Sequence, residues 1–105
     1  MENMNKFTVT EEAINAFAKE VAQRAEAWHK GGAEPLSYRD DPNLYGVVFN
    51  PMSDAEAEVF CYMAEDETFA ESFRKKVKTQ MKKMGLTLVR MTGDETGNLW
   101  VDFAN

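Results

Sequence analysis

The sequence predicts a small domain of the α+β class, in which two helices pack on a three- or four-stranded antiparallel sheet that ends in a C-terminal β-hairpin. Two apolar stripes with helical spacing, at 14–28 and 69–84, predict the helices. Two alternating segments, 86–92 and 98–104, flank the turn-forming letters GDETG and predict the hairpin. With 105 residues, 44% of them apolar and 29% charged, the chain has the size and composition of one globular domain.

The first helix is expected to begin just after Thr8 or Thr10. Either hydroxyl can accept a hydrogen bond from a backbone N–H of the first turn, and the two glutamates that follow Thr10 suit the positive end of the helix dipole. Apolar residues then recur at spacings of three and four: Ile14, Phe17, Ala18, Val21, Ala25 and Trp28. The stripe ends at Lys30 before Gly31 and Gly32, a sequence typical of a helix C-terminus.

A loop and a strand are expected next. Residues 31–43 contain two glycines, two prolines and no hydrophobic periodicity, which predicts a loop. Connections in compact domains usually run about 4–6 residues, so a loop of this length is often functional or mobile. The apolar run LYGVVF at 44–49 predicts a buried strand that ends before Asn50-Pro51.

Two periodicities fit the letters at 53–65. Read as a helix, the segment has Ser53 as its cap and Glu56 at the third position, and Ala55, Val59, Tyr62 and Met63 share a face. Read as a strand, Ala57, Val59, Cys61 and Met63 alternate with Glu56, Glu58, Phe60 and Tyr62. The capping box narrowly favours the helix.

The second clear helix is expected over about 69–84. Thr68 and Glu71 fit a capping box at its start, and Gly85 ends the apolar stripe. Both helices need a common sheet to cover their apolar faces. We therefore expect one shared core that contains Phe17, Val21, Phe69, Phe73, Val77 and Val101.

The chain contains no motif for catalysis, for a cofactor or for a metal. Its one histidine, His29, and its one cysteine, Cys61, are far apart and lack metal-ligand spacing. His29 suits the C-terminal end of the first helix, and Cys61 is expected to be a small packing residue. No phosphate-loop, dinucleotide or elbow-serine sequence occurs. These observations favour a binding protein without cofactor or metal over an enzyme.

The sequence favours a cytoplasmic protein consisting of a single domain over 1–105, with 1–7 as a flexible N-terminal tail. The tail has no apolar segment of the kind found in signal peptides, and no stretch is apolar enough to span a membrane. A single cysteine cannot form an intramolecular disulfide, which suits a reducing compartment.

Charge is distributed unevenly along a chain whose formal net charge is −6. Residues 54–71 carry seven acids and no base, whereas 74–90 carry seven bases and no acid. The bases at 74–83 spread around the polar side of a helix without interleaved aromatic residues, so a solvated face is expected and nucleic acid is an unfavoured partner. The acidic run predicts either an interface for a basic partner or a surface that the lysine-rich helix neutralises.

Three groups of residues are candidates for binding a partner. Trp100 alternates away from Leu99, Val101 and Phe103, so it is exposed unless a helix covers its face; buried tryptophan is the commoner state, and burial is expected. The second group is the loop stretch Tyr38, Arg39, Asp40 and Asp41, rich in residue types found at interfaces and turns. The third is the acidic set Glu56, Glu58, Glu65 and Glu67.

These features favour a small acidic protein that acts by binding another protein, one with a basic surface; the sequence also allows a homo-oligomer, but no membrane partner. In size and acidity alone, the chain is similar to small phage or mobile-element accessory proteins, including anti-CRISPR and anti-restriction inhibitors, some of which imitate nucleic acid with carboxylates. That similarity implies an inhibitor or regulator of a nucleic-acid-handling protein. Two alternatives remain: a small enzyme or ligand-binding domain with a pocket between helices and sheet, and a nucleic-acid binder that uses the lysine-rich helix 74–83.

Overall fold

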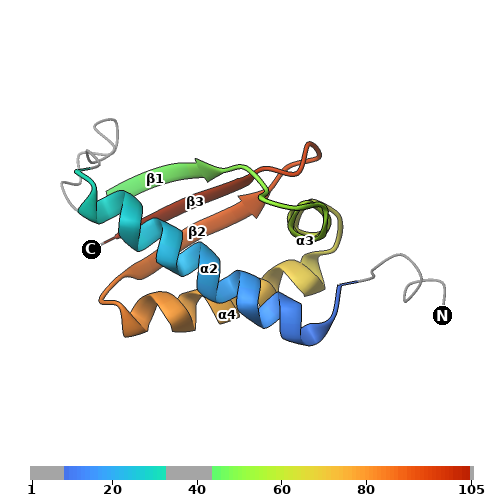
Figure 1. Cartoon of the computed structure of the whole chain (residues 1–105), viewed down its shortest axis with the longest axis horizontal. Helices are drawn as coiled ribbons and strands as arrows, with labels where there is room; N and C mark the ends of the chain where they lie inside the picture. Colours follow the sequence, from blue (N-terminus) through green and yellow to red (C-terminus); the bar gives the residue numbers. More distant parts are fainter. Residues whose placement is uncertain (1–8, 33–43, 105) are drawn as a thin grey trace.

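The computed structural model describes residues 9–32 and 44–104. This part of the chain contains three helices and three strands (Figure 1). In chain order they are α2 (Glu11–Lys30), β1 (Leu44–Phe49), α3 (Asp54–Glu65), α4 (Glu67–Lys83), β2 (Thr87–Gly93) and β3 (Leu99–Ala104). The α+β class and the C-terminal hairpin are confirmed. The expected tail 1–7 and the loop residues Tyr38, Arg39, Asp40 and Asp41 lie outside the described residues.

The three strands form an antiparallel sheet in the order β1-β3-β2. The C-terminal strand is therefore central, and the other two are edges. Across the sheet, one row aligns Val48, Trp100 and Thr92, and the row two residues along aligns Gly46, Asp102 and Arg90. The register of β2 shifts between Leu88 and Arg90, which makes a bulge at Val89.

The helices cover one face of the sheet. Figure 1 shows α2 and α4 running along the same side of the strands, with α3 seen end-on near the hairpin. Burial alternates along β3 as this layering requires: Leu99, Val101 and Phe103 are fully buried, whereas Trp100 is 51% exposed. A strand with helices on one side only has one buried and one exposed face.

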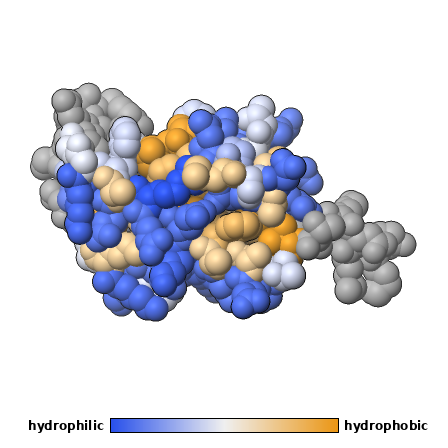
Figure 2. Space-filling view, viewed as in Figure 1, coloured by the Kyte–Doolittle hydropathy of each residue, from blue (hydrophilic) through white to orange (hydrophobic). Residues whose placement is uncertain are grey.

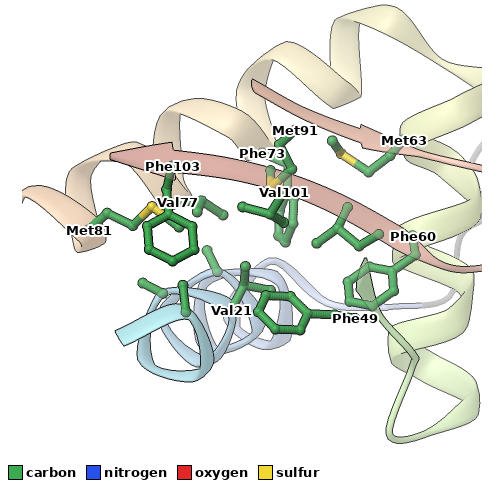
Figure 3. Close-up of a cluster of buried hydrophobic side chains, with 14 of the residues drawn as sticks. Val21, Phe49, Phe60, Met63, Phe73, Val77, Met81, Met91, Val101 and Phe103 are labelled. Carbon is green, nitrogen blue, oxygen red and sulfur yellow. The ribbon is translucent and has the colours of Figure 1, made fainter. Parts of the chain in front are cut away.

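A single core fills the space between the sheet and the helices. Figure 3 shows Val77 and Met81 of α4, Phe60 of α3 and Val101 of β3 pointing into it. Of the core residues predicted from sequence, Val21, Phe73, Val77 and Val101 are buried. Phe17 and Phe69 are only partly buried and pack against the edge of the core. Trp28, the last member of the first stripe, is 46% exposed.

Side-chain caps fix where the helices begin. Thr10 caps α2 by accepting a hydrogen bond from Ala13 N at 3.1 Å. The expected cap at Thr68 is wrong, because Asp66 caps α4 and accepts from Phe69 N at 3.1 Å. A carboxylate at this position also suits the helix dipole, and α4 consequently begins two residues earlier than its apolar stripe.

Residues 54–65 are helical, as the capping box favoured. Ser53 caps α3 and accepts a hydrogen bond from Glu56 N at 3.1 Å. The buried face of α3 is rotated from the expected one and consists of Glu56, Val59, Phe60 and Met63. The rotation follows from close packing on β2: a Cβ added at Gly93 would lie 2.6 Å from Met63 Cβ and nearer still to the Phe60 carbonyl oxygen. Only glycine allows this approach.

The outer surface of the helical layer is polar. Figure 2 shows mostly hydrophilic residues on the side of the molecule that α2 and α4 face, with separate smaller hydrophobic areas. Within residues 9–32 and 44–104, no helix has both the length and the hydropathy needed to cross a bilayer.

Candidate functional site

The open face of the sheet carries an exposed tryptophan at its centre. We define the Trp100 face as the two rows described above: Gly46, Val48, Arg90, Thr92, Trp100 and Asp102. Trp100 is 51% exposed and its neighbour Val48 is 40% exposed, so two apolar side chains stand together in water. The expectation that Trp100 is buried was wrong, because no helix in the described part of the chain covers this face.

The hairpin loop holds the indole of Trp100 in place. Asp94 Oδ2 accepts a hydrogen bond from Trp100 Nε1 at 2.9 Å. The other oxygen, Oδ1, accepts from Thr96 N at 2.9 Å, from the Thr96 hydroxyl at 2.6 Å and from Asn98 N at 3.0 Å. One carboxylate therefore both closes the turn and fixes the orientation of the exposed ring.

These hydrogen bonds keep Asp94 ionised. The Thr96 hydroxyl contributes most, followed by the Trp100 indole and the Asn98 amide, and together they hold the pKa of the carboxyl well below its usual range. The loop therefore keeps its hydrogen bonds throughout the neutral and mildly acidic range.

Beside Trp100, the face is polar but electrically balanced. Arg90 Nη2 donates to Asp102 Oδ2 at 3.0 Å across the two strands. Arg90, Thr92, Trp100 and Asp102 line a shallow depression of about 250 Å³. The face thus presents a neutral ion pair and an aromatic ring on a chain whose net charge is −6.

A second polar cluster lies where α2, α3 and the end of β1 meet. Arg24 of α2 donates to Glu56 Oε1 at 3.5 Å and to the Asn50 carbonyl oxygen at 3.1 Å. Its guanidinium also lies 4.5 Å from the centre of the Phe49 ring. Glu56 Oε1 accepts in addition from Met52 N at 2.7 Å, so the carboxyl turns back to the residue that precedes the Ser53 cap of α3.

Glu56 is fully buried, which corrects its assignment as a surface carboxylate for a partner. Its Oε2 is buried and has no hydrogen-bond partner among the described residues. Burial raises the pKa of Glu56, and the nearby Glu20 carboxyl raises it further, while the Met52 amide and Arg24 oppose the shift. When Glu20 and Glu56 are both ionised, neither carboxylate can donate a hydrogen bond to the other. A proton on either carboxyl would therefore supply a donor for Glu56 Oε2. Within this cluster the Glu56 side chain is shielded from solvent, whereas the Arg24 side chain is 25% exposed.

The remaining predicted acids lie at or near the α3–α4 junction. Glu65 and Glu67 are exposed, and Glu58 is half-buried. In the described part of the chain, the ion pair that joins the acidic segment to the basic one is Glu67 with Arg74, at 2.6 Å. Arg74 of the lysine-rich helix therefore neutralises one carboxylate of the acidic run directly.

The basic residues of α4 are divided between structural contacts and solvent. Arg74 also donates to the Met91 carbonyl oxygen at 3.1 Å, and Lys76 pairs with Glu11 of α2 at 2.9 Å. The others expected on a solvated face are exposed: Lys75, Lys78, Lys82 and Lys83. This division suits a helix that packs on one side and faces water on the other.

The lone histidine and cysteine have ordinary packing environments. The His29 ring stands edge-on to Tyr45, with 4.8 Å between ring centres, at the end of α2. Cys61 is half-buried, and its sulfur lies 3.9 Å from the Glu95 carbonyl oxygen.

The described residues present two sites of interest, the Trp100 face and the Arg24–Glu56 pair. Among them, no group of three or more His, Cys, Asp or Glu side chains is arranged to hold a metal ion. The buried, perturbed carboxyl belongs to a structural ion pair, and the depression at Trp100 is shallow. Comparison of the chain with protein families, with curated proteins and with solved structures found no match.

Proposed function

We propose that this protein is a non-enzymatic binding protein and that its partner is another protein, which docks on the Trp100 face. The observation that carries the proposal is the half-exposed ring of Trp100, fixed by Asp94 at the centre of the sheet face that no described helix covers. Tryptophan is strongly enriched among the residues that dominate binding energy at protein interfaces.

The ordered ring lowers the entropic cost of association. A side chain that already has its bound orientation loses less freedom when a partner covers it, and immobilising a flexible side chain costs about 0.5–1.5 kcal/mol. Val48 extends the apolar contact on one side of Trp100, and Thr92 offers a hydroxyl on the other. The Arg90–Asp102 pair provides polar groups at the rim that a partner can recognise.

Protein suits this surface better than the alternative ligands. A depression of about 250 Å³ is smaller than most small-molecule pockets, which usually measure about 300–1,000 Å³ and enclose most of the ligand. Nucleic acid is disfavoured because the chain has a net charge of −6 and the one arginine of the Trp100 face is paired with Asp102.

The acidic junction supports a partner with a basic surface. Glu65, Asp66, Glu67 and Glu71 are all exposed within one short stretch. Complementary fields between such a stretch and basic residues accelerate association and fix orientation. A nucleic-acid-handling protein has such a surface, and inhibition or regulation of such a protein is the specific role that we propose.

Capture of partners from cell lysate tests the Trp100 face. Wild type, Trp100→Ala and Trp28→Ala would be immobilised at equal density, and bound proteins would be identified by mass spectrometry. Trp28 is the matched control, since its exposed fraction of 46% is close to the 51% of Trp100 but it lies on α2. We expect a protein that is retained by wild type and Trp28→Ala and lost at least tenfold with Trp100→Ala.

A partner that Trp28→Ala loses and Trp100→Ala keeps would contradict the proposal. Charge reversal then tests the acidic junction with the captured partner. Glu65→Lys with Glu71→Lys should slow association and reduce its salt dependence, while thermal unfolding stays almost unchanged. Unchanged association would remove the basic partner from the proposal and leave the Trp100 face in place.

A further inference from the structure

The two edges of the sheet differ in how they are protected against pairing with another strand. On β2, a bulge at Val89 interrupts the register, and Arg90 follows it. Bulges and charged residues are the usual devices that prevent an edge from accepting a further strand. On β1 the register with β3 is regular from Leu44 to Phe49, and the six residues include no charge and no proline.

Within residues 9–32 and 44–104, the outer edge of β1 therefore has no partner strand for its backbone donors and acceptors. In the described part of the chain, β3 is the one strand that pairs with β1. A regularly paired, uncharged strand of this length can act as a template for another strand at its free edge. We infer that β1 pairs antiparallel with β1 of a second copy of this chain, which forms a dimer with one continuous six-stranded sheet.

A second copy suits this edge for two reasons. An antiparallel pair of identical strands is related by a two-fold axis, so the same residues satisfy both edges, and two-fold dimers are the commonest oligomers. The absence of charge on β1 also means that the contact itself brings no like charges together, although each chain has a net charge of −6.

The alternation of β1 restricts the register. Tyr45, Val47 and Phe49 face the helices, whereas Gly46 and Val48 belong to the open face. Paired residues point to the same face of a sheet, so pairing odd positions with odd ones keeps the helices of both copies on one side. A two-fold axis at Val47, which places Val48 opposite Gly46 of the second copy, satisfies this condition.

Such a dimer joins two open faces into one surface. A three-stranded face with six-residue strands measures about 14 Å by 20 Å, roughly 300 Å², whereas a standard interface covers about 800 Å² on each partner. Doubling the sheet brings the joined face much closer to that area. The inference nevertheless stands on the edge of β1 alone and does not require that Trp100 binds anything.

Analytical ultracentrifugation of the full chain tests the dimer. Between about 1 μM and 500 μM, the range expected for a small interface, the weight-average mass should rise from 11.9 kDa towards twice that value. Val48→Lys adds a charge to the β1 edge, and Thr92→Lys is its matched control on the β2 edge. Both side chains are exposed in the same row on either side of Trp100, so both variants should fold.

We expect Val48→Lys to weaken dimerisation at least tenfold and Thr92→Lys to leave it unchanged. Hydrogen exchange gives a second measurement, because amides of β1 should gain protection as the wild-type concentration increases. A single mass of 11.9 kDa over the whole range would overturn the inference. An equal loss of dimer affinity in both variants would also overturn the inference, because that result places the contact on the open face. A dimer that Val48→Lys does not weaken would overturn it as well.

Discussion

Replacement of Arg24 by methionine tests the account of the buried carboxyl. Arg24 is the charge partner of Glu56. The Glu56 side chain is 1% exposed and the Arg24 side chain is 25% exposed. Removing one member of a buried ion pair leaves the other charge uncompensated, which typically costs about 3–5 kcal/mol. The cost here should be lower, because Arg24 reaches solvent and the contact of 3.5 Å is long.

The other contacts of Arg24 add to the stability that Arg24→Met loses, and this addition does not depend on the charge of Glu56. The hydrogen bond to the Asn50 carbonyl contributes about 1 kcal/mol. The position over the Phe49 ring contributes about 0.5–1 kcal/mol. With about 1 kcal/mol for the lost charge pair, Arg24→Met should reduce the free energy of unfolding by roughly 3 kcal/mol at pH 8 and by about two-thirds as much where Glu56 is protonated.

The pH dependence follows from the direction of the pKa shift. Because the pKa of Glu56 is raised in the folded state, folding takes up a proton between the unfolded and folded pKa values. The contribution of Glu56 to stability is fully favourable below its unfolded-state pKa of about 4.5. It is lost as pH rises through the folded-state pKa. Arg24→Met should steepen this loss and extend it to higher pH.

Urea denaturation between pH 4.5 and 8 measures these differences, with Glu56→Gln as the control. Glutamine still accepts the Met52 hydrogen bond but has no charge, so this variant should lack the glutamate-dependent slope. In the double variant, Arg24→Met with Glu56→Gln, the arginine replacement should cost only the stability that comes from the Asn50 and Phe49 contacts. An equal cost of Arg24→Met at pH 4.5 and pH 8 would refute a buried ionised carboxylate at this position.

Three further results are expected. Phe73→Ala should destabilise the fold by about 3–5 kcal/mol in urea melts, because Phe73 is fully buried at the centre of the core; a loss below about 1 kcal/mol would contradict that placement. Gly93→Ala should cost about 1–3 kcal/mol by the same measurement, since the added methyl group overlaps the Phe60 carbonyl, and an unchanged melt would show that α3 can move away. Asp94 has a lowered pKa, so its contribution to stability should be present above the unfolded aspartate pKa and decline as pH falls. The indole N–H resonance of Trp100 should report that protonation at very low pH, and Asp94→Asn should shift the resonance at neutral pH.

The sequence predicted the elements well because their signals are local. The stripe of α2 and its threonine cap lie within one segment, and the Ser53–Glu56 capping box distinguished helix from strand at α3. The predicted start of α4 was wrong because the prediction used local signals alone. Asp66 and Thr68 are both capping residues two positions apart, and a local rule cannot choose between them.

Burial of individual side chains was harder to predict because it depends on distant contacts. The charge pattern placed Glu56 on an acidic surface, whereas its capping position already required its carboxyl to turn back towards the backbone. The partner that makes burial tolerable is Arg24, on another helix, 32 positions earlier in the chain. Trp100 presents the opposite case. Alternation along β3 separates its two faces but does not say whether a helix covers the second face as well as the first.

The position of Trp100 depends mainly on the hairpin that carries it. Asp94 lies six positions before Trp100, and the contacts that fix its carboxylate are with Thr96 and Asn98. Loss of core packing should therefore reduce the folded fraction without altering the ring in the molecules that remain folded. Variants such as Phe73→Ala should bind a partner with unchanged affinity per folded molecule, whereas Asp94→Asn should weaken binding with less effect on stability. This separation distinguishes the residues that form the candidate binding surface from those that only support the fold.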